Sequence, residues 1–417
     1  MEIFIYIEID NKTLLVGQLW HRIKNGRESS SFEYDKSWLS YPERFALEPA
    51  LKLGVGQYQT KDSQSIFGSI GDSAPDRWGR VLMRRANSNV TSPRSLNETD
   101  YLLMVDDKTR QGALRFKTNP EGQYLSSTSK VRIPPLIELP KLITASEKII
   151  NNDESYKDIL LLLDPGSSLG GARPKSSICY PDGSLAIAKF PRKDDYDNIE
   201  GWEAVALTLA QLSNINTPSW EYRKVGDKPV LLVKRFDRVG KKRIPFISAM
   251  SMLGSTDNQK DKNSYLEIVD SISQYSNTVK EDMHELYKRI ALNILISNTD
   301  DHLRNHAFLY DSYGWSLSPV YDINPTPVEI KPRILSLNID FDDAAASIDT
   351  LLSVSEEFRL KQKEAKKIIQ YIGKAVSQWH VIAKKQGLSK NEIERMASAF
   401  EHEDQKIVKK LNHKLNS

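Results

Sequence analysis

Three polar residues between positions 300 and 322 have the types and the order that phosphoryl transfer requires. Asp300 precedes Asn305 by five residues, and Asp322 follows after an aromatic-rich stretch. In such reactions one Asp orients the attacking hydroxyl, while an Asn and a second Asp hold Mg²⁺ on the phosphates. The alternative is a polar loop that only caps a helix. A single Asp would favour that alternative, but three such residues in this order favour a catalytic site.

A helix is expected immediately before these residues. Its apolar side chains recur at the 3.6-residue period of one helix face: Met283, Leu286, Tyr287, Ile290, Ala291, Ile294 and Leu295. This helix would place Asp300 in a loop at the end of a buried element, which is a common position for catalytic groups.

The segment 164–177, DPGSSLGGARPKSS, is rich in glycine and lies just before an expected strand. Glycines allow backbone N–H groups to approach and hold phosphates, so Gly170 and Gly171 are candidate nucleotide-binding residues. Arg173 and Lys175 could add positive charge. The segment is not a Walker A loop, because no Gly-Lys-Ser/Thr follows the glycines. A flexible turn is the alternative.

A buried lysine is expected in the strand LAIAKFP, which begins at Leu185 and includes Phe190. Lys189 would share a face with Ile187, and apolar residues occupy both faces of this strand. Burying an unpaired ammonium is costly, so Lys189 needs an anionic partner. Glu203, among apolar residues of an expected helix over 198–212, is the nearest candidate, and a strand Lys paired with a helix Glu is a kinase arrangement. The alternatives are a lysine that reaches water and a half-exposed Glu.

The segment 229–238, PVLLVKRFDR, is predicted to be a buried strand that ends in charged residues. In a kinase such a strand leads into the hinge that contacts adenine. Phe236 could stack against the base, and Asp237 could hold the ribose. Each of these signals is weak by itself. However, the glycine-rich loop, strand Lys, helix Glu, hinge strand, catalytic loop and metal Asp occur in the order of a kinase.

The chain resembles HipA-type serine/threonine kinases, the toxins of two-component toxin–antitoxin operons, over nearly its whole length. The motifs that carry the resemblance are SFEYDKSWL and PDRWGR in the N-terminal part, SSLGGARPK in the phosphate loop, LLVKRFDR at the hinge, and TDDHLRN and SPVYDINP in the catalytic and metal-binding segments. Two positions depart from the family pattern: Lys234, where the family commonly has an acidic residue, and Pro174 in the phosphate loop.

The resemblance implies a role for each matching site residue. Asp300 would be the catalytic base, and Asn305 and Asp322 would be the Mg²⁺ ligands. Lys189 would be the lysine that contacts the ATP phosphates.

The family's autophosphorylated loop serine would be Ser168, although the adjacent Ser167 leaves the modified position open. The resemblance also implies ATP and Mg²⁺ as cofactors and a protein substrate such as an aminoacyl-tRNA synthetase. A HipB-like helix-turn-helix antitoxin would be the partner, and the protein would contact DNA only through this antitoxin.

One alternative is an inactive kinase fold that regulates a DNA-binding antitoxin, but the intact catalytic residues argue against it. Another is a zinc pair at His302 and His306, for which no third His or Cys ligand is evident.

The composition suits a globular protein without membrane spans. The 417 residues are 39% hydrophobic and 27% charged, and no apolar run approaches the roughly 20 residues that a span requires. The N-terminus carries Glu2 and Glu8 and is typical of a strand pair rather than a signal peptide. The lone Cys179, expected in the core, excludes an internal disulfide and fits a cytoplasmic protein. A net charge of +3 is too small to indicate nucleic-acid binding.

The expected fold is α+β and kinase-like, of the HipA type. It would have a small N-terminal α/β module, a mixed nucleotide-binding lobe and a mostly helical catalytic lobe. The predicted boundaries are 1–130 for the module, 131–145 for a proline-containing linker, 146–240 for the nucleotide-binding part and 241–417 for the helical lobe.

Some local features are predicted as well. Asp72 or Ser73 is expected to cap a helix that begins near Pro75, and LSKNE at 388–392 is expected to form a capping box. Basic clusters within 77–85 and 241–243 could touch DNA in an antitoxin complex, but a solvated surface is favoured.

Overall fold

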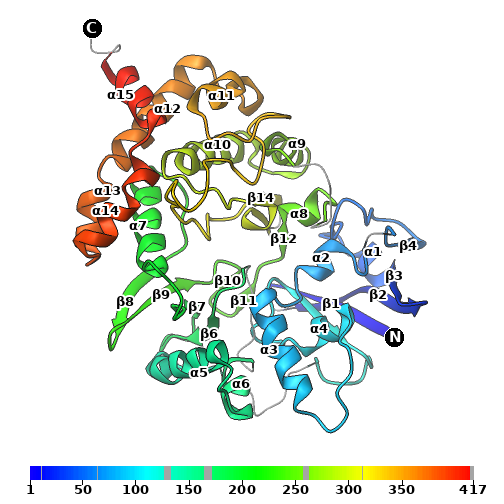
Figure 1. The fold of residues 1–417 in the computed structure, drawn as a ribbon. Helices are drawn as coiled ribbons and strands as arrows, with labels where there is room; N and C mark the ends of the chain where they lie inside the picture. The colour runs from blue at the N-terminus through cyan, green and yellow to red at the C-terminus, as the bar shows by residue number, and fades with distance from the viewer. Residues whose placement is uncertain are drawn as a thin grey trace.

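The computed structural model describes residues 1–10, 12–62, 64–125, 133–163, 171–256, 263–311 and 313–413. These residues form an N-terminal module, a mixed α/β lobe and a mostly helical lobe (Figure 1). The module, blue and cyan in Figure 1, and the last helices, orange and red, lie at opposite sides of the molecule.

An antiparallel sheet is the centre of the N-terminal module. Its described strands have the order β4-β3-β2-β1-β5. Ile3, Ile5 and Ile7 of β1 are fully buried at alternate positions, because one face of the strand packs on the core. The predicted N-terminal strand pair is confirmed by the pairing of β1 with β2. The elements of this module are β1 (Glu2–Ile9), β2 (Lys12–Lys24), β3 (Arg27–Tyr34), α1 (Lys36–Ser40), β4 (Gln57–Gln59), α2 (Gly68–Gly71), α3 (Arg77–Ser88), α4 (Glu98–Met104) and β5 (Leu114–Lys117).

The α/β lobe contains a second antiparallel sheet, whose described strands have the order β6-β7-β9-β8. Its elements are α5 (Leu139–Asn151), α6 (Tyr156–Leu163), β6 (Lys175–Cys179), β7 (Leu185–Lys189), α7 (Ile199–Leu212), β8 (Trp220–Val225) and β9 (Lys228–Lys234). On one face, Ala186, Ala188 and Leu232 share a buried cluster with α5 and α6. Ile187 and Lys189 lie on the other face. Elements cover both faces, which explains why β7 is apolar on both sides.

Helix α3 packs on the α/β lobe although it belongs to the N-terminal part of the sequence. Trp78, Leu82 and Ala86 lie in the same buried cluster as α5, α6 and the sheet. The Trp78 indole N–H also donates to the backbone oxygen of Lys175 in β6, at 3.0 Å. The first turn of α3 is therefore fixed directly to the strand that follows the glycine-rich segment.

Asp76 caps α3, which corrects the predicted caps Asp72 and Ser73. Asp76 Oδ1 accepts from Gly79 N at 2.8 Å. Asp72 instead accepts from the backbone N and the hydroxyl of Ser248, at 2.7 and 2.8 Å. Burial raises the pKa of the Asp72 carboxyl even though these bonds oppose the shift. Asp72 thus links the module to the start of a helix in the mostly helical lobe.

The predicted linker 131–145 is helical in its second half, because α5 begins at Leu139. Pro140 lies in the first turn of α5, where a missing N–H breaks no helical hydrogen bond. Proline therefore begins this helix instead of interrupting it. The remaining domain boundaries stay a prediction.

Helices dominate the lobe that follows β9. Its elements are β10 (Arg238–Val239), β11 (Lys242–Arg243), β12 (Phe246–Ser248), α8 (Ala249–Met252), α9 (Tyr265–Tyr275), α10 (Val279–Leu295), β13 (Ala307–Asp311), β14 (Gly314–Leu317), α11 (Ile348–Ser353), α12 (Gln362–Val376), α13 (Trp379–Lys385), α14 (Lys390–Phe400) and α15 (Glu403–His413). Helix α10 is the predicted buried helix, and it ends shortly before Asp300. The capping box of Ser389 and Glu392 at the start of α14 is confirmed.

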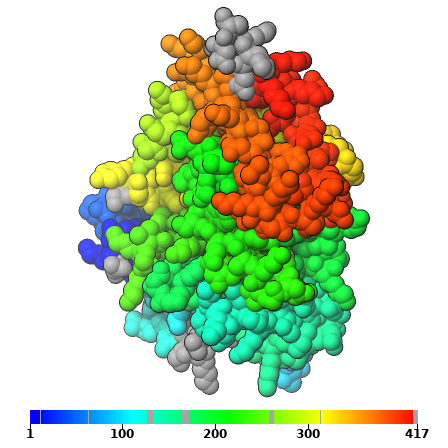
Figure 2. Space-filling model, turned by 90° about the vertical axis from the view of Figure 1, so that its left-hand side faces the viewer, coloured from blue at the N-terminus to red at the C-terminus, as the bar shows by residue number. Residues whose placement is uncertain are grey.

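The C-terminal helices cover α7. In Figure 2 the orange and red residues lie against the green residues of the α/β lobe. Trp379 of α13 stacks on Phe400 with ring centroids 4.5 Å apart, and both rings lie near Trp202 of α7. Over the described residues, no helix is both long and apolar enough to cross a membrane.

Candidate active site

Three charged side chains meet at the end of β7. Lys189 Nζ donates to the two carboxylate oxygens of Glu203 at 2.6 and 2.8 Å and to Asp322 Oδ1 at 3.0 Å. Burial alone would lower the pKa of Lys189, but Asp322 and Glu203 raise it above its ordinary value. The lysine therefore stays charged in the interior. The structure brings the predicted Lys189–Glu203 pair together and adds Asp322 to it.

Asp322 has a backbone conformation that residues with a Cβ rarely adopt. Its φ is 58°, in the left-handed region, which Asp and Asn tolerate better than most residues. Such conformations persist where the surroundings impose them, and they cluster at functional sites. Burial would raise the pKa of the Asp322 carboxyl, but Lys189 and Lys175 outweigh it, so the pKa lies below its ordinary value. Asp322 is therefore a charged carboxylate.

An apolar pocket lies beside this charged cluster. Besides Lys189, Glu203 and Asp322, its lining consists of Ile187, Leu207, Pro218, Val233, Lys234, Phe236 and Tyr321. The rings of Phe236 and Tyr321 have centroids 5.5 Å apart. Aliphatic and aromatic walls that end at a lysine and carboxylates suit a flat base that carries phosphates. The predicted placement of Phe236 at a base is compatible with this lining.

The loop after α10 exposes Asp300 and buries Asp301. The Asp300 side chain is 77% exposed, so a second molecule can reach it. The Asp301 carboxylate accepts three hydrogen bonds, from the Tyr265 hydroxyl at 2.6 Å and from Asn293 Nδ2 and His306 Nε2 at 2.8 Å each. These three hydrogen bonds make Asp301 a buried anchor, and they fix the backbone of the neighbouring Asp300.

Asn305 has an oxygen that is suitable for a metal ion. Its Nδ2 donates to the backbone oxygen of Asp300 at 3.1 Å, whereas its buried Oδ1 has no hydrogen-bond partner among the described residues. A buried polar atom of this kind normally has a partner. Mg²⁺ prefers oxygen ligands, so the Asn305 amide oxygen and the Asp322 carboxylate fit it.

One hydrogen bond joins the segments that carry these two oxygens. The hydroxyl of Tyr321 donates to the backbone oxygen of Arg304 at 2.6 Å. Tyr321 precedes Asp322, and Arg304 precedes Asn305, so this contact fixes the two candidate metal ligands relative to each other.

The zinc alternative finds no support in the geometry. His306 is hydrogen-bonded to Asp301, and no three His, Cys, Asp or Glu side chains of the described residues are grouped to hold a metal ion.

Most residues of the basic clusters within 77–85 and 241–243 form ion pairs with carboxylates of the same chain. Their ion pairs include Arg80–Glu98, Arg85–Glu154, Lys242–Asp10 and Arg243–Asp107.

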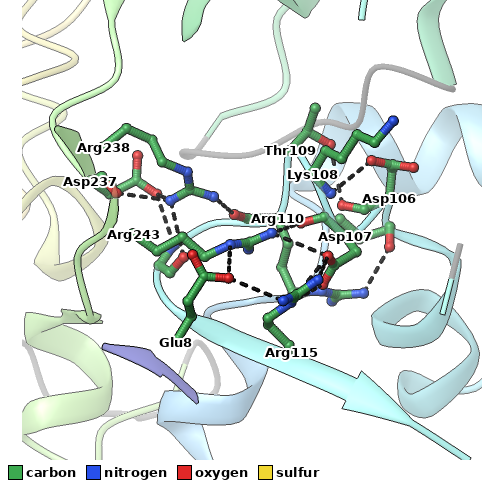
Figure 3. A network of polar contacts seen from close by, with 12 residues as sticks. Glu8, Asp106, Asp107, Lys108, Thr109, Arg110, Arg115, Asp237, Arg238 and Arg243 are labelled. Carbon is green, nitrogen blue, oxygen red and sulfur yellow. Dashed lines mark hydrogen bonds and ion pairs between the residues drawn. The ribbon is translucent and has the colours of Figure 1, made fainter. Parts of the chain in front are cut away.

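Asp237 lies outside the pocket, which corrects its predicted contact with ribose. It is fully buried, and its oxygens accept from Arg235, from Arg238 and from the backbone N of Gly112 at 2.8 Å. Gly112 has a φ of 72°, a conformation that favours glycine. Figure 3 shows Asp237 at the edge of a network that connects the hinge to Glu8, Asp107, Arg110, Arg115, Arg238 and Arg243. Asp237 therefore fastens the N-terminal module to the hinge.

Lys175 is buried, and its Nζ lies 2.8 Å from Oδ2 of Asp76. A Cβ at Gly171 would lie 3.3 Å from Lys175 Nζ and 3.9 Å from Asp322 Oδ2. The end of the glycine-rich segment thus adjoins the charged cluster. The predicted residues Ser167, Ser168 and Gly170 lie outside the described residues.

Sequence reasoning missed Asp76, Tyr321 and the buried anchor around Asp301. The position of Asp76 before a helix indicates a cap, but no local signal points to a lysine 99 residues away. Tyr321 and Asp301 are neighbours of predicted residues, and their partners come from elements that are distant in sequence.

Known proteins share both the sequence pattern and the fold. A family model described as "HipA-like C-terminal domain" matches residues 167–379, slightly more than half of the chain. The chain belongs to the HipA family. In Sinorhizobium fredii, the protein named "Putative kinase Y4mE" is 25% identical over 322 residues, which cover 71% of this HipA-family chain and 72% of the relative. "Putative kinase Y4dM" from the same organism is 26% identical over 198 residues, 43% of the chain and 48% of that relative.

The solved structure of Shewanella oneidensis HipA, from a complex with HipB and operator DNA, has the same fold. It aligns with a TM-score of 0.67 at 16% identity and covers 99% of this chain and 97% of the other. The predicted HipA resemblance and the α+β, kinase-like fold are confirmed, and the chain is a HipA-family kinase.

Proposed function

We propose that this HipA-family kinase transfers phosphate from ATP to serine or threonine hydroxyls with the help of Mg²⁺. The observation that carries the proposal is the bonding of Lys189 to both Glu203 and Asp322 at the end of an apolar pocket. A lysine held by a helix glutamate and placed beside a metal-binding aspartate is how kinases position ATP phosphates.

Each side chain of the site has a task in this proposal. Lys189, fixed by Glu203, contacts the phosphates. Asp322 and Asn305 hold Mg²⁺, which when bound offsets the negative charge of the phosphates. Asp300 accepts a hydrogen bond from the acceptor hydroxyl and takes up its proton as the phosphate is transferred.

The proposal extends to a toxin–antitoxin pair. The Shewanella protein of the same fold is described as HipA with HipB and operator DNA. By this similarity, the partner is a HipB-like helix-turn-helix antitoxin that contacts DNA, and the substrate is a protein such as an aminoacyl-tRNA synthetase. The proposed place of action is the cytoplasm.

Intact-mass measurement after incubation with Mg-ATP tests the proposal. We expect added phosphate on Ser168 or Ser167, because the glycine-rich loop of kinases covers the ATP phosphates. A phosphoserine adds a charge of about −1.5 to −2 there and should lower ATP affinity. The double change Ser167→Ala and Ser168→Ala should remove the added mass. Phosphate found only outside 164–177 would contradict the autophosphorylation site, and no transfer to any protein would favour an inactive regulatory fold.

Asp322→Asn is expected to remove most of the Mg²⁺ dependence of ATP binding. The substitution keeps the size of the side chain but loses the charge that Mg²⁺ and Lys189 need. Calorimetric titration of ATP with Mg²⁺ and with EDTA measures the effect. Wild type should bind more tightly with Mg²⁺, whereas the variant should bind similarly in both buffers. A variant with the full Mg²⁺ effect would contradict the metal role.

A further inference from the structure

Two lysines lie directly opposite each other beside the candidate phosphate site. Lys175 of β6 pairs with Lys189 of β7 in the antiparallel register, so the two side chains leave the same face of the sheet. Like charges in such a pair repel each other, and both side chains are largely buried, at 3% and 14% exposure. Each ammonium therefore needs its own counter-charge.

The carboxylates that face the two lysines come from different parts of the chain. Lys189 has Glu203 and Asp322, as described above. Lys175 has Asp76, whose side chain is 4% exposed and whose Oδ2 lies 2.8 Å from Lys175 Nζ. Asp76 belongs to the N-terminal module, so this module contributes a negative charge to the site.

Further hydrogen bonds fix the position of Asp76. Its other oxygen, Oδ1, accepts from Gly79 N and caps α3. Two residues further along, the Trp78 indole N–H donates a hydrogen bond to the backbone oxygen of Lys175. The first turn of α3 therefore fixes Lys175 at both its backbone and its ammonium.

The Lys175 ammonium also lies near Asp322. Both Lys175 Nζ and Asp322 Oδ2 lie within 4 Å of the Cβ position that Gly171 leaves empty, at 3.3 and 3.9 Å. Without Asp76, the Lys175 ammonium would compete with Lys189 for Asp322, which is also the candidate metal ligand. An ammonium has three N–H donors, so the bond to Asp76 does not by itself prevent Lys175 from donating to a phosphate.

We propose that Asp76 is a positioning residue of the N-terminal module that holds Lys175 for the ATP phosphates and keeps it away from Asp322. This inference rests on the proposed kinase function. It makes the module a part of the nucleotide site, with an effect that is confined to the phosphate end of ATP.

The full-length Asp76→Asn variant tests this inference, because Asn caps helices about as well as Asp but cannot neutralise Lys175. We expect the Kd for Mg-ATP to rise about tenfold or more. The Kd for adenosine should not change, because adenosine has no phosphates. The matched control is Asp35→Asn, the same change at the cap of α1, where Asp35 accepts from Ser37 N and forms no ion pair within the described residues. The control should bind Mg-ATP like wild type.

A second variant shows whether Asp76 acts through Lys175. Lys175→Met should also weaken Mg-ATP but not adenosine, and adding Asp76→Asn to it should cause little further loss. Equal losses for ATP and adenosine, or additive losses in the double variant, would overturn the inference and indicate a purely structural role. An Asp76→Asn variant with wild-type ATP affinity would overturn it as well. If wild type itself bound no Mg-ATP, the proposed function would fail first.

Discussion

Replacing Asp300 by Asn is expected to lower the rate of phosphate transfer from Mg-ATP by roughly 10²–10⁴-fold, the usual contribution of a general base. The fold should not change, because the Asp300 side chain is 77% exposed. Binding of ATP should also persist, since Lys189 and Asp322 remain. Phosphate incorporation measures the rate, and calorimetry measures ATP affinity in the same samples.

Two further variants make this result specific. Asp270→Asn removes another exposed carboxylate, on α9, and should leave the rate unchanged. Asp301→Asn disturbs the buried anchor with three donors and should reduce thermal stability as well as activity. Near wild-type transfer by Asp300→Asn would show that another group accepts the proton.

The second large effect is expected for stability. Asp237→Asn should lower the free energy of unfolding by about 3–5 kcal/mol, the cost of removing one partner of a buried ion pair. The side chains of Asp237 and Arg235 are fully buried. Burial lowers the pKa of Arg238 only to about 9, so Arg238 stays charged at neutral pH. Without the carboxylate, its charge would be uncompensated. Chemical denaturation at neutral pH measures the loss.

The pH dependence of this contribution has a definite sign. Burial would raise the pKa of Asp237, but Arg235 and Arg238 hold it well below its ordinary value. The stabilisation is therefore present above the ordinary Asp pKa of about 3.9 and is lost as acid protonates the folded carboxylate. The surface pair Arg192–Asp194 is the control, and Asp194→Asn should not shift the denaturation midpoint. An equally stable Asp237→Asn variant would contradict the role of the network.

Features with strong local signals could be predicted from the sequence. The apolar period of α10, the two-sided apolar strand β7 and the capping box at Ser389 each depend on residues within a few positions of one another. The Lys189–Glu203 pair could also be predicted, because the two elements are adjacent in the chain and a buried lysine needs a partner.

Contacts between distant segments could not be predicted in the same way. Asp237 follows a hinge motif, so a ligand role was a reasonable expectation, but its partner Gly112 N is 125 residues away. The prolines near residue 135 indicated a linker, yet Pro140 is compatible with the first turn of α5. The deciding contacts of Asp237 are tertiary, and a single sequence contains no direct record of them.

The packing of α3 has a consequence for how the chain could be divided. Trp78, Leu82 and Ala86 complete a cluster whose other members follow β5 in the sequence. A break between β5 and α5 would give two polypeptides. One would carry the apolar side chains of α3, and the other would carry the apolar surface of α5, α6 and the sheet on which they pack. Burial of that surface, together with the Asp76–Lys175 and Asp237–Gly112 contacts, would drive the fragments to reassemble. Fragment complementation is thus built into this architecture, and the nucleotide site would be complete only in the reassembled pair.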